Sequence, residues 1–100
     1  MTFRMDDGVT VDTARSRRRW EEATDFNGRN YISRATGDQW VHETLFESAK
    51  GRYYIVTASQ WQGSRDSARW VSATEAAAWL ALCDHGIPPE LAAAAGSAVE

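Results

Sequence analysis

The chain has 100 residues, 43% of them hydrophobic and 25% charged, which is the balance of one globular domain rather than of a disordered chain. The net charge of −3 excludes a global electrostatic attraction to nucleic acid or to anionic membranes. The single cysteine, Cys83, excludes an internal disulfide and is typical of a reducing compartment.

The first 18 residues are polar and show no hydrophobic period, so they predict a flexible or disordered arm. Four positive charges fall within five residues near its end, at Arg15, Arg17, Arg18 and Arg19. From Trp20 to Glu100 there are six basic and eleven acidic residues, which gives that part a charge of −5. We therefore expect a basic arm over residues 1–18 and a single acidic domain over residues 19–100.

The strand signals begin after a segment, residues 20–26, whose pattern is ambiguous between a helical turn and an approach to a sheet. Asn27-Gly28 is typical of a turn, and residues 30–34 predict a short strand. Alternating side chains then start at Trp40, and aromatic and β-branched residues follow the turn at Gly51. These segments predict a central antiparallel hairpin over about residues 40–59.

Residues 68–71 can add another strand, which gives a short antiparallel sheet of three or four strands. A meander and a sheet with the 30–34 strand inserted fit the sequence equally well. The pattern then changes to a helical period, with apolar side chains at Ala76, Trp79, Leu80 and Cys83.

That period predicts a helix over about residues 73–84. Ser72 and Glu75 have the spacing of a capping box at its start, and Gly86 is expected to take the C′ position at its end. A short C-terminal helix is expected to open near Pro89. The fold class predicted is therefore α+β, a sheet packed on one capped helix, with Trp70 and Trp79 in the core.

No set of residues with the spacing of a catalytic or metal site is found. His42-Glu43 begins like a metalloprotease helix motif, but Phe46 stands where the second histidine is required. Cys83 and His85 lie at neighbouring helical positions that point apart, which is unsuited to proton sharing. We expect a protein that is not an enzyme and that has no cofactor or metal.

An aromatic loop at the end of the hairpin is the best candidate for binding a partner. Exposed Trp, Tyr and Arg side chains anchor many protein interfaces. The candidate partner-binding residues are Trp61, Gln62, Arg65, Tyr53 and Trp40. The alternative for Trp61 is that its ring folds back over the sheet edge.

The stretch from Glu43 to Leu80 resembles small, uncharacterised bacterial proteins associated with phages, plasmids and other mobile elements. The resemblance rests on an aromatic hairpin and a capped helix, here Leu45-Phe46, Lys50-Gly51, Tyr53-Tyr54, Ser72, Glu75-Ala76 and Trp79-Leu80. It implies the fold, and by analogy it makes anti-defence inhibitors, including anti-CRISPR proteins, a class to consider.

Three functions are therefore weighed. The leading one is a non-catalytic, cytoplasmic protein-interaction module, an anti-CRISPR-like inhibitor of a larger bacterial complex, acting as a monomer or homodimer without a membrane contact. The second is a small nucleic-acid-associated regulator, a plasmid accessory protein or antitoxin, that grips phosphates through Arg15–Arg19. The third, a small-molecule binder or minor enzyme with a pocket between sheet and helix, lacks the convergent polar groups it would need.

Overall fold

A computed structural model of the protein describes residues 1–26, 28–38, 40–59 and 66–92. The strands, one 3-10 helix and one α-helix follow in this order: β1 (Thr2–Arg4), β2 (Thr10–Asp12), η1 (Thr13–Arg15), β3 (Arg18–Glu21), β4 (Thr24–Phe26), β5 (Tyr31–Ser33), β6 (Val41–Glu47), β7 (Tyr53–Ser59), β8 (Ser67–Val71) and α1 (Ala73–Leu82). Residues 89–92 are also helical.

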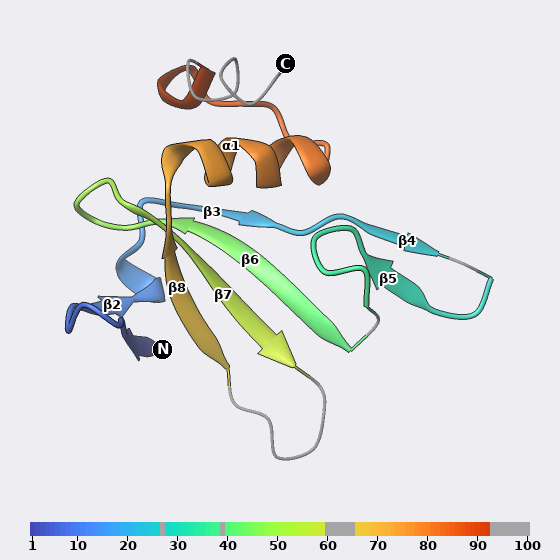
Figure 1. Ribbon diagram of the computed structural model, residues 1–100, viewed down its shortest axis with the longest axis horizontal. Coiled ribbons are helices and arrows are strands. Elements are labelled where there is room, and N and C mark those ends of the chain that lie inside the picture. Colours follow the sequence, from blue (N-terminus) through green and yellow to red (C-terminus); the bar gives the residue numbers. More distant parts are fainter. Residues whose placement is uncertain (27, 39, 60–65, 93–100) are drawn as a thin grey trace.

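The main sheet has four antiparallel strands in the order β3-β6-β7-β8, and two further hairpins, β1–β2 and β4–β5, stand beside it (Figure 1). The architecture is α+β, as expected, and the predicted central hairpin is the β6–β7 pair. Strands β6, β7 and β8 form the meander that was one of the two alternatives. The fourth strand of the sheet is β3, and the strand at Tyr31–Ser33 is not inserted in this sheet but pairs with β4.

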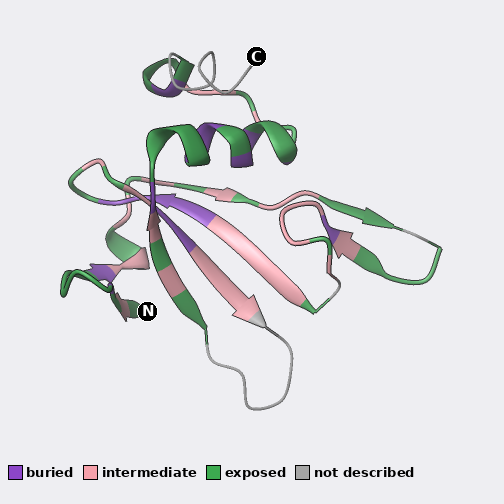
Figure 2. Cartoon of the chain, viewed as in Figure 1, coloured by how far each residue is buried: buried purple, intermediate pink, exposed green. Residues whose placement is uncertain are grey.

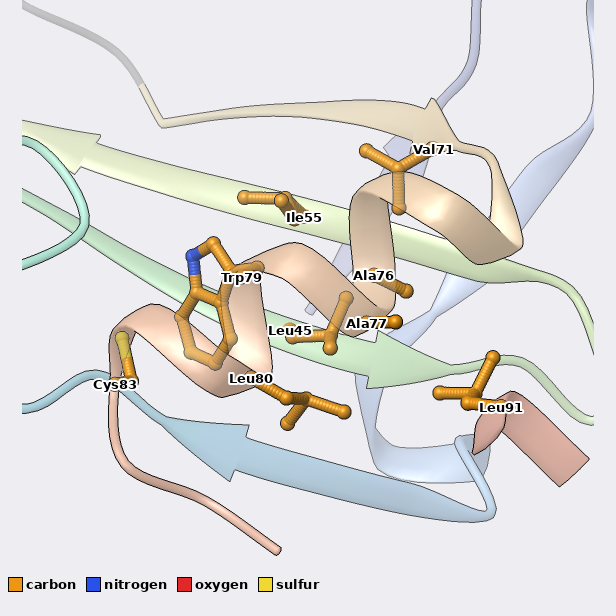
Figure 3. Packing of buried hydrophobic residues seen from close by; sticks show 9 residues of the cluster. All are labelled: Leu45, Ile55, Val71, Ala76, Ala77, Trp79, Leu80, Cys83 and Leu91. Carbon is orange, nitrogen blue, oxygen red and sulfur yellow. The ribbon is translucent and has the colours of Figure 1, made fainter. Parts of the chain in front are cut away.

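The strand period of two places apolar side chains on both faces of the sheet. Leu45 and Ile55 are cross-strand partners, and both lie under α1 (Figure 3). Phe46 and Tyr54 are the next pair, and they face the opposite way. The sheet is therefore buried on both sides, and the cluster under α1 consists of Leu45, Ile55, Val71, Ala76, Ala77, Trp79, Leu80, Cys83 and Leu91.

The second face is covered by the N-terminal hairpin, so the prediction of a disordered arm over residues 1–18 was wrong. Met5 and Val11 are 3% and 7% exposed, and Phe3 packs on the same cluster. Gly8 takes a φ of 87° in the turn between the two strands. This hairpin is ordered because it removes Phe46 and Tyr54 from water, which is a tertiary effect invisible in local composition.

Helix α1 begins where the sequence predicts. The Ser72 side chain accepts a hydrogen bond from the Glu75 amide at 3.1 Å, which satisfies one of the orphan donors of the first turn. The second bond of a capping box would run from the Ser72 amide to the Glu75 carboxylate. Here that carboxylate accepts from Arg69 Nη1 at 3.0 Å instead. Trp79, 6% exposed, lies in the core as predicted, while Trp70 is partly buried on the opposite face.

The helix ends differently from the prediction. Asp84, not Gly86, takes the left-handed conformation, with a φ of 58°. The Asp84 amide donates to the carbonyl of Ala81, and the His85 amide donates to the carbonyl of Leu80 at 2.9 Å. This is the bonding pattern of a Schellman motif, and an aspartate is one of the few residues besides glycine that tolerate its C′ position.

Within the described residues, no helix is both long enough and apolar enough to cross a membrane.

Candidate protein-interaction site

The β4–β5 hairpin carries two exposed aromatic rings at its outer end. Phe26 and Tyr31 are cross-strand partners, and their ring centroids lie 5.0 Å apart at an interplanar angle of 37°. Phe26 is 59% exposed and Tyr31 is 64% exposed. The hairpin extends away from the main sheet (Figure 1), and its outer part is exposed (Figure 2). The pair therefore presents apolar surface to solvent rather than to the core.

Ion pairs centred on Arg34 hold the base of this hairpin. The Arg34 guanidinium donates to both carboxylate oxygens of Asp25, at 2.8 and 2.9 Å, and also binds Asp84 after helix α1. The hydrogen bonds that Arg34 donates to Asp25, and then the one that it donates to Asp84, raise the pKa of Arg34, while the guanidinium lowers the pKa of Asp25. The bidentate bonds to Asp25 thus join the two sides of the hairpin, and the single bond to Asp84 links the hairpin to the end of helix α1.

A second set of hydrogen bonds joins the base of the β4–β5 hairpin to the main sheet through Glu22, whose side chain is 9% exposed. Its carboxylate accepts from the hydroxyl of Ser33 in β5, binds Nδ1 of His42 in β6 and accepts weakly from the Glu43 amide at 3.4 Å. A buried carboxylate is stable only when its oxygens are satisfied in this way. Together the interactions of Arg34 and Glu22 fix the position of the exposed ring pair relative to the main sheet.

The structure describes two of the five partner-binding residues that the sequence predicted, Trp40 and Tyr53, and they lie at opposite ends of the β6–β7 pair. Trp40 is 41% exposed just before β6, where its amide donates to the Asp38 carboxylate at 2.7 Å. Tyr53 is half-buried and packs against the cluster under α1. The side chain of Tyr53 packs there because its position in β7 alternates with that of Tyr54. Three predicted residues, Trp61, Gln62 and Arg65, lie outside the described residues.

The arginine run does not form a free arm. Arg18 donates to Glu47 at 2.8 Å and also binds Glu90, and the bond to Glu47 is the main cause that raises the pKa of Arg18. Arg19 binds Glu21 within β3. The other two arginines precede β3: Arg15 lies 3.9 Å from the Asp12 carboxylate, and Arg17 is exposed.

The residues with potential chemistry are engaged in packing. Cys83 is 4% exposed, and burial raises the pKa of its thiol, which disfavours the reactive thiolate. The His85 ring stacks on Trp79 with centroids 6.1 Å apart, and its Nε2 donates to the carbonyl of Glu21 at 2.5 Å. In the part of the chain that the structure describes, no three His, Cys, Asp or Glu side chains gather closely enough to hold a metal ion.

The sequence predictions missed Phe26 and Tyr31. A signal was present, because Asn27-Gly28 lies between a short segment that ends in an aromatic residue, Phe26, and one that begins with an aromatic residue, Tyr31. That arrangement is typical of a hairpin with cross-strand aromatic partners. Comparison of the chain with the models of known protein families, with curated proteins and with solved structures finds no match in any of the three.

Proposed function

We propose that the protein is a non-catalytic protein-interaction module that binds its partner through the β4–β5 hairpin. The observation that supports this most is the exposed ring pair of Phe26 and Tyr31 on a hairpin that is braced at its base.

Aromatic side chains are effective anchors because each can remove roughly 150–250 Å² from water on binding. An anchor that is already in place loses less conformational entropy when the complex forms. Here Phe26 and Tyr31 support one another, while Arg34 and Glu22 hold the hairpin below them. The arrangement is therefore suited to fill an apolar pocket on a partner with little rearrangement.

The resemblance to proteins of mobile elements points to the class of partner, a larger bacterial complex of the kind that anti-defence inhibitors bind. The nucleic-acid alternative has less support, because two of its four arginines, Arg18 and Arg19, are neutralised by carboxylates. An extended phosphate grip would need those charges to be available.

The test is an affinity pull-down from bacterial lysate with nuclease and high salt, followed by titration of each captured protein after purification. The double variant Phe26→Ala/Tyr31→Ala is compared with Leu82→Ala, which removes an exposed apolar side chain (52% exposed) from helix α1 instead. We expect the hairpin variant to lose the partner and Leu82→Ala to keep it.

Loss of two anchors should weaken binding by roughly 500-fold or more, since hot-spot residues cost at least about 2 kcal/mol each and every step of about 1.4 kcal/mol is tenfold. Both variants are first checked for an unchanged melting temperature. A partner that binds the hairpin variant as tightly as the parent protein would refute the proposed site. Recovery of nucleic acid alone, lost at high salt, would favour the regulator instead.

A further inference from the structure

A pocket of about 600 Å³ lies on the face of the sheet opposite α1. The β1–β2 hairpin that lines it lies on the other side of the main sheet from the β4–β5 hairpin (Figure 1). Residues of the β1–β2 hairpin form one wall, the turn between β6 and β7 forms another, and Tyr54 and Trp70 of the sheet line it as well. The volume falls within the roughly 300–1,000 Å³ of ordinary small-molecule sites. The packing of the N-terminal hairpin on the sheet thus creates a cavity that the sequence did not predict.

Positive charge is concentrated around this pocket, although the whole chain is acidic. Arg15, Lys50 and Arg52 line it, and Asp12 is the carboxylate among its lining residues. A nitrogen of Arg17 also lies 3.9 Å from where a Cβ on Gly51 would stand, so a fourth cation reaches the same turn. Cations gathered beside a concave surface raise the local concentration of anions.

Two of these four cations are already engaged and two are not. Arg52 lies over the Trp70 ring, 3.6 Å from its centroid, and binds Asp7 at 3.2 Å. Arg15 pairs loosely with Asp12 at 3.9 Å. Lys50 and Arg17, by contrast, make no ion pair with any residue that the structure describes. Lys50 therefore supplies an uncompensated charge in the lining of the pocket, and Arg17 supplies a second one beside Gly51 in the adjoining turn.

Hydroxyl groups complete the polar lining. Ser16 Oγ shares a hydrogen bond of 2.5 Å with the phenol of Tyr54, and Ser48 Oγ accepts from the Arg52 amide at 3.0 Å. The Ser48 hydroxyl therefore keeps its own hydrogen to donate. Two unpaired cations and a hydroxyl donor match the doubly charged, acceptor-rich phosphate group better than a single carboxylate.

We propose that this pocket binds a phosphorylated small molecule, with its phosphate held at the β6–β7 turn by Lys50 and Arg17 and its body in the cavity. A bare phosphate would leave most of the volume empty. Phosphates of a nucleic-acid backbone share the same chemistry, but they would be met by an extended stripe of cations. The positive charge here is gathered at one turn, and the next arginines in the chain, Arg18 and Arg19, are paired with carboxylates.

The experiment titrates ¹⁵N-labelled protein with four probes: inorganic phosphate, adenosine 5′-monophosphate, glucose 6-phosphate and unphosphorylated adenosine. Shifts of the Gly51 and Arg52 amide signals report occupancy of the turn. We expect shifts with the phosphate esters and none with adenosine. Lys50→Ala should weaken binding of the esters by about tenfold, the loss expected for one charge-assisted hydrogen bond, and Lys50→Arg should restore it.

Arg69→Ala is the matched control, since it removes an exposed arginine that pairs with Glu75 instead. The hairpin variant Phe26→Ala/Tyr31→Ala should bind the esters like the parent protein, so failure of the interaction site would leave this pocket untouched. Three results would overturn the proposal: no shift with either ester at millimolar concentration, binding of free phosphate with both esters excluded, or a short single-stranded oligonucleotide that binds more tightly than the esters at equal phosphate concentration.

Discussion

Replacing Leu80 with alanine tests the packing of α1 on the sheet. Leu80 is fully buried, at 0% exposed, in the cluster between the helix and the sheet (Figure 3). Removing such a side chain usually lowers the free energy of unfolding by 2–5 kcal/mol, as lost transfer energy plus a cavity. A domain of 100 residues has about 5–15 kcal/mol in total, so we expect a loss of about 3 kcal/mol to consume a large part of it.

Leu82 offers a control two residues along the same helix. It is 52% exposed, so Leu82→Ala should lower the free energy of unfolding by less than about 1 kcal/mol, with the same change in helix propensity. Urea unfolding followed by tryptophan fluorescence and circular dichroism measures the free energy of unfolding of both variants. In thermal unfolding, the Leu80→Ala midpoint temperature should fall by roughly 10–20 °C. Equal losses for the two variants would show that α1 does not pack on the sheet through this face.

Three further predictions concern the helix ends and the pH dependence of stability. Ser72→Ala should lower the free energy of unfolding by about 1 kcal/mol and Ser72→Gly by only a few tenths in urea titrations, because the lost bond is the N-cap to the Glu75 amide; equal effects would exclude the cap. Asp84→Gly should raise the melting temperature, since glycine adopts the left-handed backbone at a φ of 58° without strain. Asp84→Asn loses the same charge facing Arg34 but keeps a side chain, so it should not raise the melting temperature. A lower melting temperature for Asp84→Gly would mean that the ion pair outweighs the strain. Burial raises the pKa of Cys83 above its ordinary 9.0 and that of Tyr54 above its ordinary 10.0. The stability that these groups contribute is therefore complete below those ordinary values and is lost as pH rises through the folded pKa values. Tyr54→Phe should flatten the alkaline end of the plot of unfolding free energy against pH, and an unchanged plot would contradict this.

Local pattern was sufficient for the elements whose signals lie close together in the chain. The period of two around Leu45 and Ile55 placed the β6–β7 hairpin, and Ser72 placed the start of α1 within a residue. Both signals are short-range: strand alternation and an N-cap are properties of neighbouring residues, so they survive in the sequence alone.

The composition of the chain also limited which metal and catalytic sites could be expected. A lone cysteine and two histidines left little material for a metal site, and the helical spacing of Cys83 and His85 argued against a shared proton. The structure places Cys83 in the core and His85 on Trp79. These statements depend on composition and local geometry, which the folded state does not change.

Tertiary structure alone decided the role of the N-terminus and the position of the pocket. Phe3, Met5 and Val11 are too few to order a segment by themselves, and they become a hairpin only because Phe46 and Tyr54 offer an apolar face to cover. That packing forms the pocket and brings residues from opposite parts of the chain to one turn. Burial on the second face of a sheet is the sum of distant contacts, and no local period encodes it.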